Sequence, residues 1–209
     1  MKKKYAGAVL AMGMFLALAL EGCGGTEAAE DAGSGGNEKN VQKEETSGNE
    51  ESGENIFGEF EAKTLDGEDV TQEIFGQSKL TMINIWGTFC GPCIQEMPDL
   101  GEIADEYADK GFQIVGICTD AVNLDGEILE DVVETAKADA QETGADYLHI
   151  VPVGEIFTDL LPRVTGVPTT IFVDSKGQQI GLADIGAKDK DAWIQVIEEK
   201  LAQAGQEEG

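Results

Sequence analysis

Basic residues are scarce in this sequence of 209 residues. It contains 14 lysines and arginines against 41 aspartates and glutamates, which gives a formal net charge of −27 at pH 7. So negative a chain repels the phosphate backbone of nucleic acids, and it also resists adsorption to an anionic membrane surface. The composition therefore excludes a nucleic-acid-binding protein. Any attachment to a membrane must come from something other than a basic patch.

Histidine and cysteine are also rare, with one histidine and four cysteines in the chain. The only Cys-x-x-Cys sequence runs from Cys90 to Cys93. A structural zinc site needs about four ligands, which His149 and a single cysteine pair do not supply. Attachment of a c-type haem needs a histidine directly after the second cysteine, where this chain has Ile94. We therefore expect neither a metal ion nor a cofactor.

Long apolar runs are missing except at the amino end, where residues 5–20 follow three lysines and contain no charge. This pattern is typical of a secretory signal. Residues 20–23, Leu-Glu-Gly-Cys, resemble the bacterial lipobox, which implies cleavage after residue 22 and a lipid on the Cys23 thiol. Glu21 departs from that motif, and an uncleaved anchor helix is the alternative. Either arrangement places the remaining chain outside the cytoplasm, anchored to the cell membrane.

The next segment, residues 24–55, has nine acidic residues, seven glycines and no aromatic residue. Such a composition cannot bury enough apolar surface to offset the entropy lost on ordering. We therefore assign residues 1–22 to a lipoprotein signal peptide and residues 23–55 to the lipidated cysteine and a disordered acidic tether. Residues 56–209 form the folded domain.

The apolar pattern of residues 56–209 alternates between strand and helix periods, which predicts an α/β domain with a mixed sheet between helices. A hairpin is expected within residues 57–70. Further strands are expected at residues 80–86, 112–118, 147–151 and 169–174, and around 179–183. Helices are expected at residues 91–110, 126–143, 155–161 and 190–204.

The Cys-x-x-Cys sequence lies where the strand at residues 80–86 gives way to a helix. Free backbone N–H groups and the positive end of the helix dipole stabilise a thiolate at that junction. The thiolate is the attacking species in disulfide exchange, so Cys90 is the expected nucleophile. Cys93 lies one turn further along, deeper in the fold, and is expected to resolve the mixed disulfide. Pro92 fits the first turn of the helix.

Two motifs resemble the thioredoxin superfamily. Residues 84–98, Asn-Ile-Trp-Gly-Thr-Phe-Cys-Gly-Pro-Cys-Ile-Gln-Glu-Met-Pro, are similar to its active-site stretch, and residues 165–174, Thr-Gly-Val-Pro-Thr-Thr-Ile-Phe-Val-Asp, to its second signature. More narrowly, the chain resembles the TlpA/ResA-like thiol-disulfide oxidoreductases, often bacterial lipoproteins. The resemblance implies a thioredoxin fold with an N-terminal hairpin and an inserted helix within residues 121–146.

The resemblance also implies roles for individual residues. Pro168 would be the cis-proline facing the cysteine pair, with the backbone of Val167 presented to an incoming client strand. Glu96 matches an acidic residue three positions after the second cysteine, where it could accept the proton of the buried thiol. A solvated helix glutamate is the alternative. Asn84 occupies the place of the buried aspartate of plain thioredoxins.

Four further residues near the motifs or in predicted strands receive expectations of their own. Trp86 and Phe89 are expected to flank the site, with Trp86 among the substrate-contacting residues, although core packing would also explain both. Cys118 ends a predicted buried strand and is expected to be an inert core residue. His149 is expected to be structural.

These features predict a monomeric disulfide reductase that uses Cys90, Cys93 and Glu96. It would receive electrons from a membrane thiol carrier resembling CcdA or DsbD and reduce a client protein, such as an apocytochrome c or a thiol-dependent repair enzyme. The alternatives are a thiol oxidase or isomerase, a thiol peroxidase and a non-catalytic binding lipoprotein. Thr88 lies two rather than three residues before Cys90, and residues 80–87 contain no proline, which disfavours the peroxidase.

Overall fold

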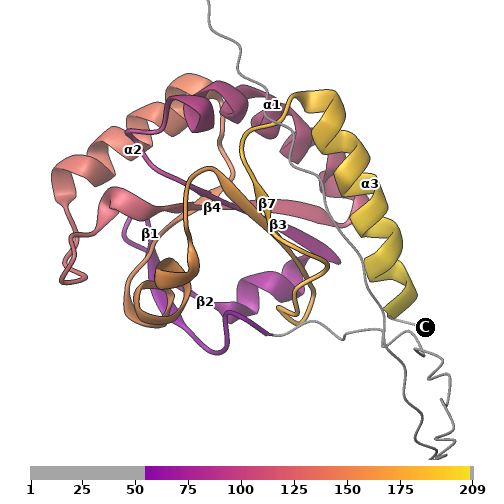
Figure 1. Ribbon diagram of the computed structural model, residues 1–209, viewed down its shortest axis with the longest axis horizontal. Coiled ribbons are helices and arrows are strands. Elements are labelled where there is room, and N and C mark those ends of the chain that lie inside the picture. Colours follow the sequence, from indigo (N-terminus) through magenta and orange to yellow (C-terminus); the bar gives the residue numbers. More distant parts are fainter. Residues whose placement is uncertain (1–54, 208–209) are drawn as a thin grey trace, which may run out of the picture. The chain divides into compact units, whose positions relative to one another are not determined.

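The computed structural model describes residues 55–207 (Figure 1), which form an α/β domain around one seven-stranded sheet. The strands are β1 (Glu61–Thr64), β2 (Asp69–Thr71), β3 (Leu80–Trp86), β4 (Phe112–Cys118), β5 (Leu148–Val151), β6 (Thr169–Asp174) and β7 (Asp184–Ile185). The helices are α1 (Gly91–Tyr107), α2 (Glu130–Thr143) and α3 (Lys190–Glu207). The proposed signal peptide, Cys23 and all of the tether except Asn55 lie outside the described residues.

The sheet is mixed, with the strand order β2-β1-β5-β4-β3-β6-β7. Strand β3 pairs in parallel with β4 and antiparallel with β6, while β4 pairs in parallel with β5. The β1–β2 hairpin adds to the edge of β5, and β7 adds to β6. The predicted thioredoxin-type mixed sheet, with an N-terminal hairpin and an inserted helix α2, is therefore confirmed.

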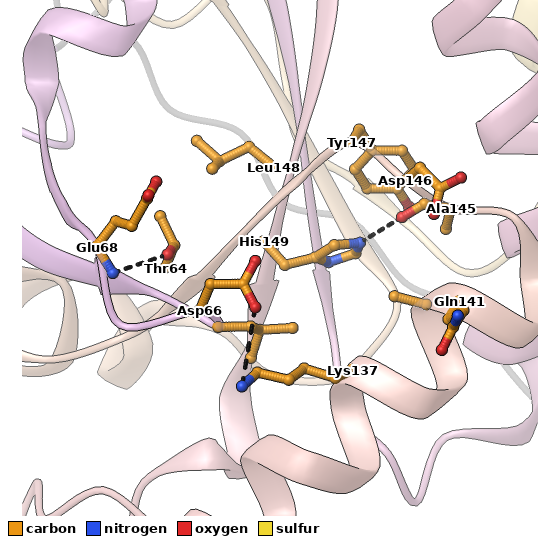
Figure 2. A pocket seen from close by; sticks show the side chains of 12 residues that line it. Thr64, Asp66, Glu68, Lys137, Gln141, Ala145, Asp146, Tyr147, Leu148 and His149 are labelled. Atoms are coloured by element: carbon orange, nitrogen blue, oxygen red, sulfur yellow. Dashed lines mark hydrogen bonds and ion pairs between the residues drawn. The ribbon is translucent and has the colours of Figure 1, made fainter.

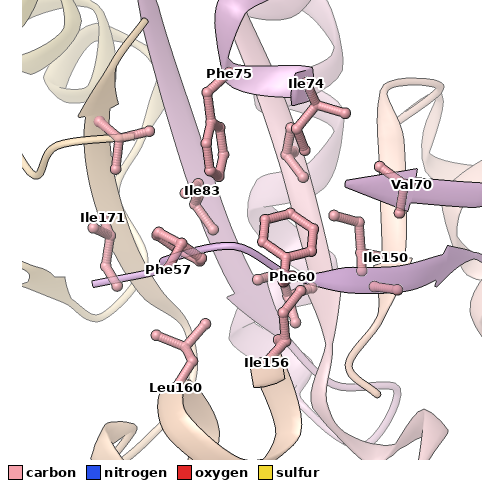
Figure 3. Close-up of a cluster of buried hydrophobic side chains, with 14 of the residues drawn as sticks. Phe57, Phe60, Val70, Ile74, Phe75, Ile83, Ile150, Ile156, Leu160 and Ile171 are labelled. Atoms are coloured by element: carbon pink, nitrogen blue, oxygen red, sulfur yellow. The ribbon is translucent and has the colours of Figure 1, made fainter. Parts of the chain in front are cut away.

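The two faces of the sheet bury different sets of side chains, as the alternation of a strand requires. Helices α1, α2 and α3 cover the face that receives Leu80, Met82 and Trp86 from β3. The opposite face receives Ile83 and Ile85 and is covered by short segments; Figure 3 shows part of this cluster. The segments include η1 (Gln72–Gln77) and η4 (Ile156–Leu160). Each large side chain fully buried there contributes about 1.5–3 kcal/mol of apolar burial.

Two predicted elements differ most from the structure. The second helix starts at Glu130 rather than residue 126, because the backbone N–H groups of residues 125 and 127 bond to the Asn123 side chain and hold a turn there. Gly126 has a φ of +79°, a left-handed conformation that suits glycine and cannot be part of a right-handed helix. The strand expected around residues 179–183 is reduced to one bridge between Val173 and Gln179, and pairing resumes only at β7.

Packing in the core fixes the position of the carboxyl end of β3. All seven residues of β3 are buried, and it pairs with a neighbour on each side. The residues between β3 and α1 therefore emerge at a fixed place beside the carboxyl end of β4. Within residues 55–207, no helix has the length and apolar character required to cross a membrane.

Candidate active site

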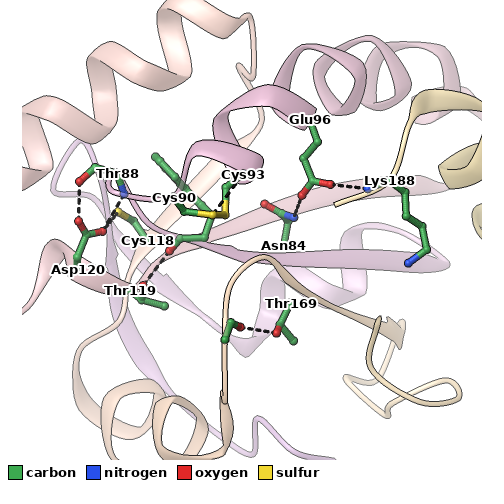
Figure 4. Close-up of a disulfide and its surroundings, with 12 residues drawn as sticks. Asn84, Thr88, Cys90, Cys93, Glu96, Cys118, Thr119, Asp120, Thr169 and Lys188 are labelled. Atoms are coloured by element: carbon green, nitrogen blue, oxygen red, sulfur yellow. Dashed lines mark hydrogen bonds between the residues drawn. A yellow bond between two sulfur atoms is a disulfide. The ribbon is translucent and has the colours of Figure 1, made fainter. Parts of the chain in front are cut away.

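Cys90 and Cys93 form a disulfide at the amino end of α1 (Figure 4), with their Cα atoms 5.3 Å apart. Cys90 is the N-cap residue of the helix, and its sulfur accepts a hydrogen bond of 3.2 Å from the backbone N–H of Cys93. Pro92 lies in the first turn, where a missing backbone N–H breaks no helical bond. The sequence thus folds locally so that one sulfur lies at the positive end of the helix dipole.

The two sulfurs differ in access. Cys90 retains 6% of its surface exposed, whereas Cys93 is fully buried. A partner's sulfur can therefore approach Cys90 but not Cys93. The unequal access matches a division into an attacking thiol and a resolving thiol.

The loop that contains Pro168 lies beside the disulfide. The peptide bond between Val167 and Pro168 is cis, as the sequence resemblance implied. Val167 packs against the buried cluster that includes both cysteines. The loop is held from both ends, because the Thr169 hydroxyl donates to the Gly166 carbonyl at 2.6 Å and the Gly186 N–H donates to the Pro168 carbonyl at 2.9 Å.

The Asp120 carboxylate holds the segment before Cys90 through two hydrogen bonds. One oxygen of Asp120 accepts the Thr88 backbone N–H at 3.0 Å, and the other accepts the Thr88 hydroxyl at 2.5 Å (Figure 4). The Thr119 hydroxyl donates to the Trp86 carbonyl at 2.9 Å. These bonds join the turn after β4 to the turn that presents Cys90. The sequence analysis missed Asp120 because its contact with Thr88 spans 32 residues and has no local signal.

Glu96 is buried, with 3% of its surface exposed, and is not the solvated alternative. Its carboxylate accepts hydrogen bonds from the Asn84 side chain at 3.0 Å, the Lys188 backbone N–H at 3.2 Å and the Trp193 indole at 3.2 Å. Burial raises the pKa of Glu96, while the bonds from Trp193, Lys188 and Asn84 oppose that rise. Of these donors, sequence analysis had singled out only Asn84.

The Glu96 carboxylate therefore lies one helical turn after Cys93, in a closed environment. Figure 4 shows it directed toward Asn84 and Lys188 rather than toward the disulfide. A carboxyl group with a raised pKa accepts protons more readily near neutral pH than an ordinary glutamate does.

Trp86 is fully buried and belongs to the same apolar cluster as the two cysteines. Of the two interpretations given for Trp86, core packing is the one that its burial in this conformation supports. The Trp86 indole N–H donates to Nδ1 of His149 at 3.2 Å, and Nε2 of His149 donates to the Ala145 carbonyl at 2.9 Å. A Cβ on Gly116 would lie 2.2 Å from Nδ1, so only glycine leaves room for this pair.

Two other residues near the site have opposite exposures. Phe89, directly before Cys90, is 71% exposed. Cys118 is fully buried, and its thiol contacts a carboxylate oxygen of Asp120 at 3.4 Å. Burial, followed by the negative charge of Asp120, raises the pKa of the Cys118 thiol well above its ordinary value. Such a thiol is rarely ionised and therefore unreactive.

A polar pocket of about 570 Å³ lies between the β1–β2 turn and α2 (Figure 2). It is bordered by Asp66 and Lys137, whose charged groups are 3.8 Å apart, and by His149. Neither cysteine of the disulfide lines it. Among residues 55–207, no group of histidine, cysteine and acidic side chains is placed to hold a metal ion.

The fold and the Cys90–Cys93 disulfide beside cis-Pro168 define the class of thioredoxin-fold thiol-disulfide oxidoreductases. Residues 54–190 match the model of the AhpC/TSA family, and the chain belongs to that family.

Comparison with known proteins agrees with this class. The chain is 29% identical over 124 residues to "Thioredoxin-like protein YneN" of Bacillus subtilis, covering 57% of this chain and 64% of that one. It is 25% identical over 120 residues to "Thiol-disulfide oxidoreductase ResA" of Halalkalibacterium halodurans, covering 57% and 61%. The matches thus span less than two thirds of these curated relatives. The predicted resemblance to ResA-like proteins is confirmed.

Solved structures show the same fold. A thiol:disulfide interchange protein from Chlorobium tepidum superposes with a TM-score of 0.56 at 23% identity, covering 68% of this chain and 93% of that one. A thiol:disulfide interchange protein from a Bacteroides species gives a TM-score of 0.54 at 22% identity, covering 69% and 87%.

The buried hydrogen bonds of His149 predict an unusual titration. Desolvation by burial lowers its pKa to about 4. Because this lies below the ordinary value of about 6.5, folding favours the neutral ring. The neutral ring therefore contributes about 3 kcal/mol to the stability of the folded state. This contribution is complete above pH 6.5 and is lost as pH falls toward 4. NMR of the imidazole, the only one in the chain, should give a midpoint near 4 with the proton on Nε2. A midpoint near 6.5 would show an exposed ring.

Proposed function

We propose that this protein is a membrane-anchored, extracytoplasmic disulfide reductase that acts on partner proteins. The observation that carries the proposal is the placement of Cys90, the more accessible sulfur, at the amino end of α1, with Cys93 buried behind it. In the working direction the reduced pair meets an oxidised partner and gives up two electrons.

The first step is attack on the partner. The Cys90 thiolate attacks one sulfur of the partner's disulfide, a mixed disulfide forms, and the other partner sulfur leaves as a thiolate that takes a proton. The N–H of Cys93, which donates to the Cys90 sulfur, and the helix dipole stabilise the attacking anion. The backbone of Val167 aligns the partner strand alongside.

The second step is resolution. Cys93 loses its proton, attacks the Cys90 sulfur, and releases the partner as a dithiol while the Cys90–Cys93 disulfide forms. Water does not reach the fully buried Cys93 freely, so a nearby acceptor is needed. Glu96 serves as that acceptor because it lies one helical turn after Cys93 and because burial raises its pKa above the ordinary value of a glutamate. A membrane thiol carrier then returns the pair to the dithiol.

The reducing direction is supported by two features. Gly91 and Pro92 between the cysteines resemble the dipeptide of reducing members of the superfamily. The domain's acidic residues also oppose formation of a thiolate. Strongly oxidising members of the superfamily depend on a stabilised thiolate in their reduced form, so its destabilisation favours the reducing direction. A thiol oxidase or isomerase is the second candidate, and the reduction potential separates the two.

A peroxidase and a non-catalytic lipoprotein are less well supported. Membership of the AhpC/TSA family does not by itself indicate a peroxidase. A peroxidase would need a threonine three residues before Cys90, whereas Thr88 lies two residues before it and bonds to the Asp120 carboxylate. A binding protein without redox activity would have no use for an accessible disulfide next to a cis-proline loop.

The membrane location rests on the residues before the described domain. The uncharged stretch of residues 5–20 and the Leu-Glu-Gly-Cys sequence support a lipid on Cys23. Cys23→Ser in the full chain should shift the protein from detergent-extracted membranes to the soluble fraction after signal cleavage, or leave it uncleaved. A wild-type protein found without lipid would remove the anchor from the proposal.

A reductase should have a reduction potential near that of thioredoxin, about −270 mV, rather than near the −120 mV of DsbA. Equilibration of the full chain with glutathione or dithiothreitol buffers gives this value. The reduced protein should also reduce insulin, and Cys90→Ser should abolish turnover because the attacking sulfur is lost. Cys118→Ser is the matched control and should retain the rate, since that thiol is buried and protonated. A potential near −120 mV would favour the oxidase instead.

Glu96→Gln should slow resolution roughly 100-fold, within the usual range for loss of an acid-base group. The first attack by Cys90 should change little, so the mixed disulfide with the partner should accumulate and be visible by mass spectrometry. Asp105→Asn, on the exposed side of the same helix, is the matched control. If both variants resolve the mixed disulfide at the wild-type rate, Glu96 has only a structural role.

A further inference from the structure

The two oxygens of the Glu96 carboxylate share its three hydrogen bonds unequally. Oε2 accepts the backbone N–H of Lys188 and the indole N–H of Trp193, each at 3.2 Å. Among the described residues, Oε1 accepts only the side-chain N–H of Asn84, at 3.0 Å. Each oxygen of an ionised carboxylate offers about two lone pairs to donors. Oε2 is therefore fully used, whereas Oε1 retains one lone pair.

The two oxygens also face different parts of the site. In Figure 4, Lys188 and the disulfide lie on opposite sides of Glu96, and Asn84 lies beneath the carboxylate on β3. Trp193, which is fully buried, reaches Oε2 from α3. The oxygen that is bonded to Lys188 thus faces away from the cysteines. A proton that comes from the cysteines therefore meets Oε1 before it meets Oε2.

The other titratable groups near Glu96 do not take that proton. Burial, followed by the negative charge of Glu96, raises the pKa of the Tyr147 hydroxyl, so this group stays protonated. Both ring nitrogens of His149 are engaged in hydrogen bonds, and burial lowers its pKa to about 4. The Lys188 ammonium is bound to the Asp184 carboxylate at 2.7 Å, and both side chains are partly exposed.

A proton on Oε1 needs an acceptor of its own, and Asn84 can supply one. Oδ1 of Asn84 is buried without a hydrogen-bond partner among the described residues, as is the hydroxyl of Thr170, its cross-strand partner. A half-turn of the Asn84 amide would bring Oδ1 opposite the carboxyl group in place of the N–H. One side chain can thus donate to the carboxylate and accept from the acid. An aspartate there would place a second negative charge beside Glu96.

We propose that Trp193 is a positioning residue for the resolving step: with the Lys188 N–H it occupies Oε2, so that Glu96 receives the proton of Cys93 on Oε1. The proposal rests on the proposed function of Glu96 and names the atom at which it acts. The Cys93 thiol gives its proton to Oε1, and its thiolate attacks the Cys90 sulfur. The bond from Cys90 to the partner breaks, and the partner sulfur leaves with the electron pair and takes a proton from solvent.

This arrangement lets Glu96 gain and lose a proton while the fold stays the same. The second oxygen of a carboxylic acid still accepts hydrogen bonds, so both donors to Oε2 keep their acceptor when the proton is on Oε1. Lys188 precedes α3 and Trp193 lies within it, so α3 stays bound to α1 in both states. The bond from Trp193 also does most among the three to oppose the rise in the pKa of Glu96.

The test follows the two steps separately in the reduced full chain. The probe is the disulfide of thionitrobenzoate, whose release is coloured: attack by Cys90 releases the first equivalent, and resolution by Cys93 releases the second. Trp193→Phe keeps an aromatic ring but loses the donor to Oε2. The pH at which the second step reaches half its maximal rate should rise by about one unit, the effect of losing one hydrogen bond to a charged group. The first step should be unchanged.

Phe172→Leu is the matched control, because Phe172 packs against Trp193 in the same buried cluster without a bond to Glu96. Equal pH profiles for Trp193→Phe and Phe172→Leu would overturn the role of Trp193 alone. Glu96→Gln should remove the pH-dependent limb of the second step. If Glu96→Gln instead resolves at the wild-type rate, the role of Glu96 in the proposed function fails as well, so the two failures are distinguishable.

A second measurement needs no variant and locates the proton. In the oxidised full chain, NMR of the Glu96 carboxyl carbon gives the midpoint of its titration. Hydrogen exchange of the Lys188 amide and the Trp193 indole is then compared above and below that midpoint, with the intrinsic pH dependence subtracted. Both N–H groups should be equally protected in the two states, because Oε2 accepts in both. Loss of protection below the midpoint would place the proton on Oε2 and overturn the proposal.

Discussion

The position of the Cys90 sulfur at the first turn of α1 is the constraint on which the site depends. Strand β3 fixes where the chain leaves the sheet, because it is buried throughout and paired on both sides. Helix α1 begins after four intervening residues, and its first N–H groups have no carbonyl partner within the helix. One of these groups donates to the Cys90 sulfur. The same geometry that ends the strand therefore prepares a site for a negatively charged sulfur.

Burial of Glu96 is tolerated only because its surroundings supply hydrogen bonds. An ionised carboxylate removed from water loses several kcal/mol of solvation, and this loss must be offset by hydrogen bonds. The three donors come from three separate elements: Asn84 on β3, Lys188 before α3 and Trp193 on α3. The carboxylate thus links the helix of the active cysteines to the sheet and to the last helix. The pKa of Glu96 stays raised because these bonds offset only part of the desolvation.

Features set by local patterns could be predicted from the sequence, and features set by distant contacts could not. The buried strands β3, β4 and β6, the helix after Cys90 and the cysteine pair follow from apolar runs and spacing, and the resemblance located cis-Pro168. The bonds of Asp120 to Thr88 and the indole of Trp86 on His149 join residues 32 and 63 positions apart. Sequence spacing contains no signal for such pairs.

The electrostatics of the domain bear on the direction of the redox reaction. A protein that stabilises its cysteine thiolate stabilises its reduced form and becomes an oxidant, as strongly oxidising thioredoxin-fold proteins do. Here the helix dipole and the Cys93 N–H favour the thiolate, but Asp120 lies on one side of the site and Glu96 on the other, within a domain of 30 acidic and nine basic residues. These charges oppose the thiolate and so favour the disulfide form. A pair that returns readily to the disulfide gives its electrons away, which is the direction that the proposed reductase function requires.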